Sequence, residues 1–508
     1  MQAPPFLSIF YCSTSRSSLE VIIEDFGAKH GKDGQKRTMA TIKEKALEFL
    51  NNNQEKLVDK LKDFVRIPSV STELQHRADI QRAAEWLARH LQSLGLEGTK
   101  IFPTSGAPVV YGASKVENPA IPTLLIYGHY DVQPTDPLGE WQSDPFEPEI
   151  RGENLFARGA SDMKGQIMAA LNALEAMRAG GDLPVQFKFL FEGEEEVGSP
   201  NLYEFIKNHR DMLACDLCLN PDTGMLGPEL PTITYALRGL AYFELRIYGP
   251  SQDLHSGTFG GVVHNPAQVL CELIAGLHDD QGRVTLPGFY DRVRDLDPQE
   301  REDLARLPVN EAFYLKNAGV KKLWGEEGYS PAERTGARPT LEVNGLLSGF
   351  TGEGSKTVLP ARAMAKISSR LVADQRVEEV KEQLERVLHD RLPDTVRWEL
   401  DQLAGAPPVL SPQDSKGITA LTSAYETVWG KRPLFRREGG TVPVGAYLQE
   451  LLGVDSVQTG FSLPDDNAHS PNEKLHLPTW QRGTEALVHF FCNLAGNGAG
   501  STADEARK

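Results

Sequence analysis

Histidine and acidic side chains stand directly after several apolar runs of this sequence, and these residue types bind divalent cations. His129 and Asp131 follow the apolar run 124–127. A histidine can bind a metal through one ring nitrogen while a nearby carboxylate accepts the N–H of the other nitrogen. Asp162 stands in a glycine-flanked segment, 159–165, where a helix is expected to begin. An isolated aspartate in that position is more often a helix cap than a ligand.

A group of four acids, Glu192 and Glu194–Glu196, follows the apolar run 185–191. Such a segment can be a solvated acidic loop before a helix, where negative charge is favoured. Gly193 and Gly198, however, enclose it in a tight turn after a strand that we expect to be buried. Closely spaced carboxylates repel one another, and a bound cation removes that repulsion. We therefore interpret the acidic group as part of a cation site.

Two further residues complete the set of candidates. Asp222 follows the apolar run 215–219, and His469 lies in a polar segment downstream of the apolar run 454–460. In open α/β sheets, ligands bind beyond the carboxyl ends of the strands, so side chains at several strand ends converge on one crevice. Each residue alone has an ordinary structural explanation. Together these segments indicate a metal-dependent active site.

Strands alternate with helices through the first half of the chain, which predicts an α/β fold with a mostly parallel sheet. Near Thr232 the pattern changes. The order strand, helix, two strands, helix and strand is that of a ferredoxin-like unit, expected at 233–248, 265–277, 340–346, 363–372, 377–388 and 395–400. A charged segment, 284–337, interrupts this unit. Helices expected at 418–428, 444–452 and 481–494 mark the return of the α/β pattern.

These patterns divide the chain into an α/β domain in two parts, 39–232 and 407–495, and an inserted α+β domain, 233–406. We expect residues 1–38 to be a flexible N-terminal extension and residues 496–508 a flexible tail. The length of 508 residues agrees with this division, since it exceeds what one hydrophobic core supports.

The 508 residues carry 53 basic and 70 acidic side chains, a formal net charge of −17. This excess argues against nucleic acid or an anionic membrane surface as a partner, and no apolar run is long enough to span a bilayer. Five cysteines are too few for a disulfide framework, which fits a reducing cytoplasm. Cys215 and Cys218 form a C-x-x-C within apolar sequence, and we expect them to be buried strand residues.

Four motifs resemble those of the di-zinc metallopeptidases of the aminoacylase and glutamate carboxypeptidase type. They are GHYDVQP at 128–134, GASDMKG at 159–165, EGEEEVGS at 192–199 and NAHSPNEKL at 467–475. Within that family their wording is most similar to the carnosine and cytosolic nonspecific dipeptidases, and the resemblance extends over 42–494. It implies a catalytic domain of three α/β/α layers, interrupted by a ferredoxin-like lid that forms dimers.

The resemblance implies two divalent ions in each subunit, zinc or else manganese or cobalt. Their ligands would be His129, Asp162, Glu196, Asp222 and His469. Asp162 would bridge the two ions. His129 and Asp222 would bind one of them, and Glu196 and His469 the other.

The resemblance also assigns catalytic roles. Glu195 would be the general base, and Asp131 would orient His129. A shift of one residue in the motif would exchange Glu194 and Glu195, so this assignment depends on the reading frame. His255, in the DLHSG segment 253–257, would reach the active site of a partner subunit and stabilise the oxyanion.

Three further residues would contact the substrate, namely Thr357, Arg370 and Thr441. Arg370 would bind the terminal carboxylate, for which a planar guanidinium is well suited. The nonspecific dipeptidases usually have serine where this chain has Thr441. The hydroxyl group is kept, while the added methyl group bears on the fine specificity.

We therefore expect a cytoplasmic, homodimeric metallo-dipeptidase that acts on small peptides with a free C-terminal carboxylate. An N-acyl-amino-acid deacylase or desuccinylase with the same metal site is the alternative enzyme. A non-catalytic binding protein would lack a ligand or the base, and this chain has all six residues.

Overall fold

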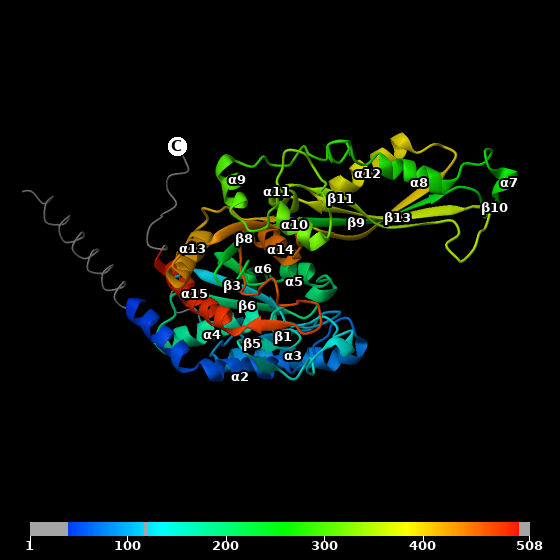
Figure 1. The fold of residues 1–508 in the computed structure, drawn as a ribbon. Coiled ribbons are helices and arrows are strands. Elements are labelled where there is room, and N and C mark those ends of the chain that lie inside the picture. Colours follow the sequence, from blue (N-terminus) through cyan, green and yellow to red (C-terminus); the bar gives the residue numbers. More distant parts are fainter. Residues whose placement is uncertain (1–38, 116–119, 497–508) are drawn as a thin grey trace, which may run out of the picture.

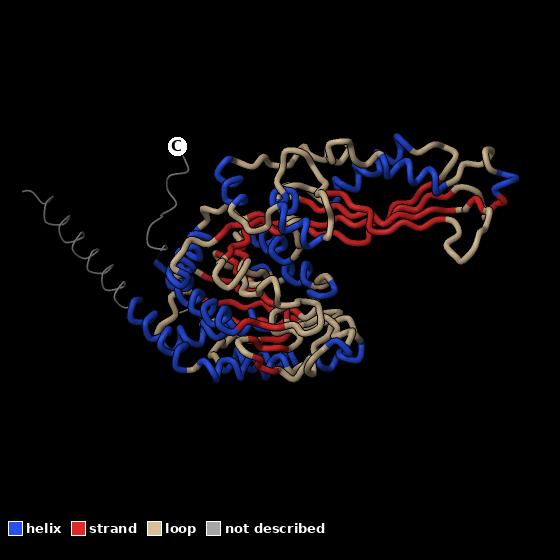
Figure 2. Tube along the Cα trace, viewed as in Figure 1, coloured by secondary structure: helices blue, strands red, loops and turns tan. Residues whose placement is uncertain are grey.

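The computed structural model describes residues 39–115 and 120–496. The expected flexible extension, 1–38, and the tail beyond residue 496 lie outside these ranges. Figure 1 shows an α/β body below and an elongated arm above it. Figure 2 shows that the arm consists of long strands with helices along one side.

The α/β body is built on a nine-stranded sheet. Across the sheet the strands are β1 (Lys100–Phe102), β2 (Val109–Ala113), β6 (Gln186–Glu192), β3 (Thr123–His129), β7 (Leu217–Asn220), β17 (Ser456–Gln458), β8 (Thr232–Leu237) and β15 (Val409–Leu410), with β16 (Leu434–Glu438) beside β8. The central strands β6, β3, β7 and β17 pair in parallel, whereas β1, β2 and β15 add antiparallel edges. The parallel centre confirms the expected fold class.

Helices cover both faces of this sheet, which confirms the three-layer architecture. One layer contains α2 (Gln54–Val65), α3 (Arg77–Ser93), α4 (Lys164–Gly180), α13 (Lys416–Trp429) and α15 (Leu477–Gly496). The other contains α5 (Leu202–Asn208), α6 (Arg210–Leu213) and α14 (Pro443–Leu452). The strands between them are continuous apolar runs, as β3 illustrates with six buried residues in succession, because both faces of a parallel sheet are covered.

The arm is a four-stranded antiparallel sheet in the order β11 (Thr340–Ser348), β13 (Arg362–Leu371), β9 (Gly239–Tyr248) and β14 (Arg397–Ala406). In β9 and β13 buried residues alternate with partly exposed ones, so that one face of the sheet is buried. Helices α8 (Pro266–Ala275) and α12 (Val377–Arg391) cover that face. The strand order confirms the ferredoxin-like insert, which we call the lid.

The segment 284–337 connects the lid to the catalytic domain. It contains α9 (Pro298–Ala305), α10 (Glu311–Ala318) and α11 (Pro331–Gly336). Helices α9 and α11 pack against β16 of the large sheet. A largely buried ion pair between Glu300 and Arg437, 2.5 Å long, fixes this contact.

The long strand expected at 233–248 is wrong, because the chain forms two strands that belong to different sheets. Residues up to Leu237 lie in β8 of the large sheet, and residues from Gly239 lie in β9 of the lid. Arg238 is the junction between them. Its neighbour Gly239 is so close to the chain's return path that a Cβ atom there would lie 2.5 Å from the Ala406 carbonyl oxygen. We therefore propose that the lid begins at Arg238 rather than at residue 233.

The two cysteines of the C-x-x-C segment lie at the start of β7 and just before it. Cys218 is buried in β7, whereas Cys215 precedes that strand and is partly exposed, with its sulfur 3.7 Å from that of Cys218. Among the helices of the described residues, none is both long and apolar enough to cross a membrane.

Candidate metal centre and active site

Three neighbouring strands bring the candidate residues to one edge of the large sheet. Strand β3 ends at His129, and its parallel neighbour β6 ends at Glu192, just before the acidic turn. On the other side of β3, strand β7 ends at Asn220, two residues before Asp222. Because parallel strands place their carboxyl ends together, the predicted convergence follows from strand order alone.

Asp162 occupies the middle of this group. Its Oδ1 lies 3.1 Å from Nε2 of His129, and its Oδ2 lies 2.9 Å from Nε2 of His469. Asp222 Oδ1 is 3.8 Å from the His129 nitrogen, and Glu196 Oε2 is 3.3 Å from the His469 nitrogen. The ligand candidates thus form two groups, one on each carboxylate oxygen of Asp162. This is the grouping expected of a bridging carboxylate.

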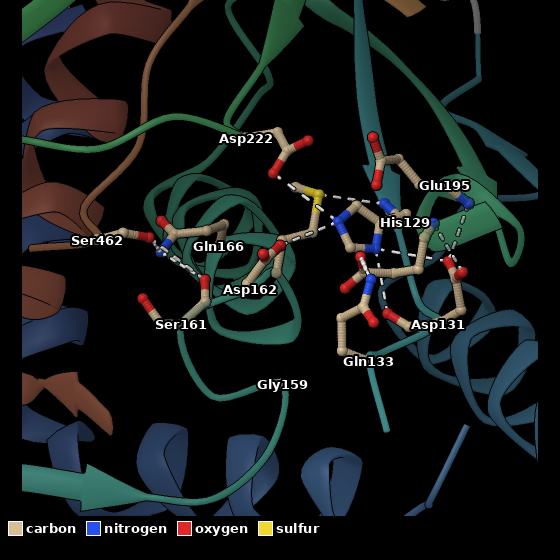
Figure 3. A network of polar contacts seen from close by, with 12 residues as sticks. His129, Asp131, Gln133, Gly159, Ser161, Asp162, Gln166, Glu195, Asp222 and Ser462 are labelled. Carbon is tan, nitrogen blue, oxygen red and sulfur yellow. Dashed lines mark hydrogen bonds and ion pairs between the residues drawn. The ribbon is translucent and has the colours of Figure 1, made fainter. Parts of the chain in front are cut away.

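The simpler explanation of Asp162 as a helix cap does not apply. Helix α4 begins at Lys164, its N-cap residue is Met163, and no side chain caps it. The Asp162 carboxylate instead faces the two histidines, and Figure 3 shows it on the opposite side of the His129 ring from Asp131.

The electrostatics of the group indicate an excess of negative charge in a buried place. Burial and the charge of Asp162 raise the pKa of Glu196 to about 7. Burial also raises the pKa of Asp222. Burial would lower the pKa of His129, but its hydrogen bonds to Asp131, Asp162 and Asp222 outweigh that effect and raise it. The group therefore retains protons that a divalent cation would displace.

Two further observations indicate that these residues suit divalent cations. Ligand atoms of His129, Asp162 and Glu196 all lie within 4.8 Å of one another. Glu196 Oε2 accepts a hydrogen bond of 2.7 Å from Gln133, while its Oε1 is buried with no hydrogen-bond partner in the structure. A buried oxygen of this kind requires a partner. Imidazole and carboxylate donors suit zinc, and carboxylates also suit manganese.

Asp131 holds two parts of the centre at once. The His129 Nδ1 lies 3.1 Å from the backbone oxygen of Asp131 and 3.5 Å from its Oδ1. The carboxylate accepts the backbone N–H groups of Glu195 and Glu196 at 3.3 and 3.1 Å (Figure 3). Asp131 therefore positions the acidic turn as well as the histidine, and the second of these contacts was not expected from the sequence.

The three consecutive glutamates have different environments. Glu194 lies away from the cluster, where its carboxylate accepts a hydrogen bond from Asn201 and lies against Gly106. Glu196 contacts His469. Burial raises the pKa of Glu195, between them, to about 9. This arrangement supports the reading frame that assigns the base to Glu195, because Glu194 points elsewhere.

Comparison with known proteins agrees with this geometry. Residues 125–493 match the family described as Peptidase family M20/M25/M40. The chain is 32% identical to the beta-Ala-His dipeptidase of Homo sapiens, over 89% of this chain and 92% of that protein. It is 31% identical to the Cys-Gly metallodipeptidase DUG1 of Candida albicans, over 86% of this chain and 94% of the relative. The protein belongs to the M20 peptidase family.

The fold is also that of solved M20 enzymes. The crystal structure of the M20 family metallo-carboxypeptidase Sso-CP2 from Sulfolobus solfataricus superposes with a TM-score of 0.76 at 33% sequence identity. The match covers 87% of this chain and 99% of that one. Human carnosine dipeptidase 1 gives a TM-score of 0.71 at 31% identity.

Glu473 is a residue of this M20 site that the sequence analysis missed. Its Oε1 accepts the backbone N–H groups of Ser161 at 2.9 Å and Asp162 at 3.0 Å. Its Oε2 accepts the backbone N–H of Gly159 at 2.9 Å and Nη1 of Arg158 at 2.7 Å. The carboxylate is fully buried, so all four bonds are made away from water. Glu473 thus fixes the turn that carries Asp162.

Because these bonds fix Glu473, they also anchor the segment that contains His469, four residues earlier in the motif 467–475. Asn467, His469 and Asn472 all adopt positive φ, at 55°, 62° and 63°. Residues other than glycine rarely adopt this backbone conformation, and those that do are concentrated at functional sites. Its position inside that motif was the one sequence signal for Glu473, since an isolated glutamate is normally expected at the surface.

The substrate candidates of the lid fall into two separate places. Arg370 Nη1 donates a 2.7 Å hydrogen bond to the Thr441 hydroxyl, near the junction of lid and catalytic domain. His255 pairs with Val358 between the short strands β10 (Leu254–His255) and β12 (Val358–Leu359), so Thr357 is adjacent to it. Strand β10 and helix α7 (Ser256–Phe259) lie at the far end of the lid, away from the catalytic domain (Figure 1). The chain therefore does not bring His255 and Thr357 to its own metal centre.

Glu473→Gln should weaken metal binding about 10–100-fold, the usual effect of removing a residue that orients a ligand. The side-chain amide of glutamine would place its N–H group against backbone N–H groups that now bond to the Glu473 carboxylate, so part of the support of Asp162 would be lost. Isothermal titration of the metal-free protein with zinc measures the change.

Glu326→Gln is the matched control, since Glu326 is also buried and pairs with an arginine, Arg338, at 2.7 Å. It should lower stability without changing zinc affinity. Unchanged zinc affinity in Glu473→Gln would contradict the assigned role.

Proposed function

We propose that this protein is a metal-dependent dipeptidase that hydrolyses dipeptides with a free C-terminal carboxylate. The observation that carries the proposal is the position of Asp162 between the two groups of ligand candidates. The named activities of the two relatives, on beta-Ala-His and on Cys-Gly, support a dipeptide substrate. We assign two divalent ions to the centre, with zinc preferred and manganese or cobalt as alternatives.

Amide hydrolysis needs a strong nucleophile and stabilisation of the negative charge that develops on the carbonyl oxygen. Two divalent cations between these ligands would supply both, by lowering the pKa of water and polarising the carbonyl group. His129 and Asp222 would hold one cation, and Glu196 and His469 the other. Asp162 would bind both through its two oxygens. Asp131 would keep His129 and the acidic turn in place.

Glu195 is the residue we propose as general base. It lies in the turn held by Asp131, and its side chain is largely enclosed by the cluster. In that position its carboxylate would accept a proton from the attacking water and deliver it to the amine that leaves. A carboxylate is suited to both steps, because it can hold the proton between them.

We further propose a homodimer in which His255 acts in the active site of the other subunit. Strand β10, which contains His255 and pairs with the strand that follows Thr357, lies at the end of the lid far from the catalytic domain (Figure 1). Its edge strand β11 exposes several large apolar side chains, and such an edge is normally covered: Val343, Leu346 and Leu347, with Phe350 just beyond the strand. His255 would then donate a hydrogen bond to the oxyanion, and Thr357 would contact the substrate beside it.

Arg370 and Thr441 are the residues we propose for the substrate's terminal carboxylate. The Thr441 hydroxyl accepts from Arg370 and donates to the backbone oxygen of Arg238 at 2.6 Å. Arg370 is therefore held by one of its nitrogens and retains others for the substrate.

Four cysteines of the described residues are free thiols, which supports a cytoplasmic location.

The function is tested by comparing release of amino acid from two panels of compounds. The first contains dipeptides, including Cys-Gly and beta-Ala-His, and the second contains N-acetyl and N-succinyl amino acids. We expect turnover of dipeptides that is lost after treatment with EDTA and restored by zinc, manganese or cobalt. Turnover of the N-acyl panel alone would favour the deacylase instead.

Glu195→Gln should lower kcat about 10²–10⁴-fold, the usual contribution of a general base. Zinc content should remain that of the wild type, because Glu195 is not among the ligands. Glu194→Gln is the control, since that side chain faces Asn201 rather than the cluster, and it should keep near-normal kcat. Comparable loss in both variants would contradict the assignment.

Co-expression of two inactive variants tests the dimer. His255→Ala and Glu195→Gln should each be inactive alone. A mixed dimer would contain one site with both defects and one with neither, so random pairing should restore about a quarter of the wild-type activity. A mixture that stays inactive while the mixed dimer is isolated would contradict the contribution of His255 across the interface.

A further inference from the structure

A second arginine lies beside the proposed carboxylate site, and none of the preceding roles uses it. Arg238 is the junction residue between β8 and β9. Its Nε is 3.4 Å from the Gly439 oxygen, and its Nη1 is 3.4 and 3.5 Å from the oxygens of Arg334 and Arg338. These partners are neutral carbonyl groups at long hydrogen-bond distances, and Glu342, whose negative charge partly offsets that of Arg238, forms no ion pair with it.

Arg370 also lacks an ion-pair partner among the described residues. Its guanidinium donates to the Thr441 hydroxyl, and within the described ranges no carboxylate lies within 4.0 Å of Arg238 or Arg370. Burial, together with the charge of Arg370, lowers the pKa of Arg238 to about 10. Burial also lowers the pKa of Arg370. The two cations therefore repel each other in a partly desolvated place.

Other buried arginines of this region show that such charges are normally neutralised within the chain. Arg338 forms two hydrogen bonds with Glu326, at 2.8 and 2.7 Å. Arg437 pairs with Glu300. Buried charges without a partner are costly, so two neighbouring guanidinium groups that lack one indicate a place for an anion.

This place adjoins the metal centre. The backbone N–H of Arg238 donates to the backbone oxygen of Glu438, at the end of β16. Arg436 Nη2 donates to the Glu438 carboxylate at 2.7 Å and to the backbone oxygen of Gly224, two residues after Asp222, at 3.2 Å. Thr441 joins the Arg238 backbone to the Arg370 guanidinium. An anion between the arginines would thus lie on the Asp222 side of the cluster, at the junction of the lid.

We propose that Arg238 is a specificity-determining residue, whose positive charge, added to that of Arg370, makes this pocket require the terminal carboxylate of the substrate. The inference rests on the proposed dipeptidase function and deepens it. Arg370 contacts the carboxylate, and Arg238 acts through charge and through its hold on the 439–441 segment. A substrate whose carboxylate is replaced by a neutral amide leaves both guanidinium groups without a counter-charge.

The test compares a dipeptide that the enzyme hydrolyses with the C-terminal amide of the same dipeptide. The wild type should strongly prefer the free acid. Arg238→Gln should raise KM for the acid at least about tenfold, the loss expected for one interaction with a charged group. Its KM for the amide and its kcat should change little, so the preference should collapse. Arg238→Lys should keep most of the preference, because the charge remains.

Arg338→Gln is the matched control. It removes a buried arginine from the same region, but one whose charge Glu326 already balances. It should lower thermal stability and leave the preference for the acid unchanged. A collapse of the preference in Arg338→Gln would show that general damage to the junction is the cause.

The outcomes separate the inference from the function on which it rests. A wild type that hydrolyses no dipeptide would overturn the proposed function, and this inference with it. A wild type that prefers the acid, with the same preference in Arg238→Gln, would overturn the inference alone. Equal loss in Arg238→Lys and Arg238→Gln would also overturn it, because charge would then not be the cause.

Discussion

The site depends on the crowding of carboxylates around Asp162 in a mostly buried place, with His469 at its exposed side. Asp222 and Glu196 approach the two histidines that share the oxygens of Asp162, and Asp131 lies fully buried behind them. Like charges in such surroundings repel strongly, and protons alone relieve the repulsion only in part. The carboxyl ends of β3, β6 and β7 bring these carboxylates together. Glu473, a further buried carboxylate, holds the turn that carries Asp162. A pair of divalent cations is the counter-charge that this arrangement suits.

The lid changes how the rest of the molecule is to be understood. Its near end carries Arg370 beside Thr441 of the catalytic domain, and its far end carries His255 and Thr357. The proposed site uses both ends and so needs two copies of the chain, which would make the subunit interface part of the chemistry. The segment 284–337 fixes the near end through Glu300 and Arg437. The junction at Arg238 is therefore firmly connected, and the proposed recognition of substrate would use the same residues that attach the lid.

Much of this was predictable because it depends on local rules. Parallel strands gather their carboxyl ends, so His129, Asp222 and the acidic turn had to meet once the strands were recognised. The ferredoxin-like order could likewise be predicted from the succession of elements. What escaped prediction depends on contacts between distant segments. Glu473 bonds to residues more than 300 positions away, and the division of 233–248 at Arg238 follows from pairing with two different sheets. Apolar residues continue on both sides of Arg238 and Gly239, so the sequence reads as one strand although β8 is buried throughout and β9 only at every second residue.

The most direct measurement of the central claim is the number of divalent ions bound by each chain. Protein freed of metal, reloaded with zinc and dialysed, would be analysed by inductively coupled plasma mass spectrometry beside Asp162→Ala. We expect two zinc ions per chain in the wild type and loss of both from the variant, because one carboxylate holds the two sites together. A wild type that retains a single ion, or an Asp162→Ala variant that still retains two, would contradict this expectation.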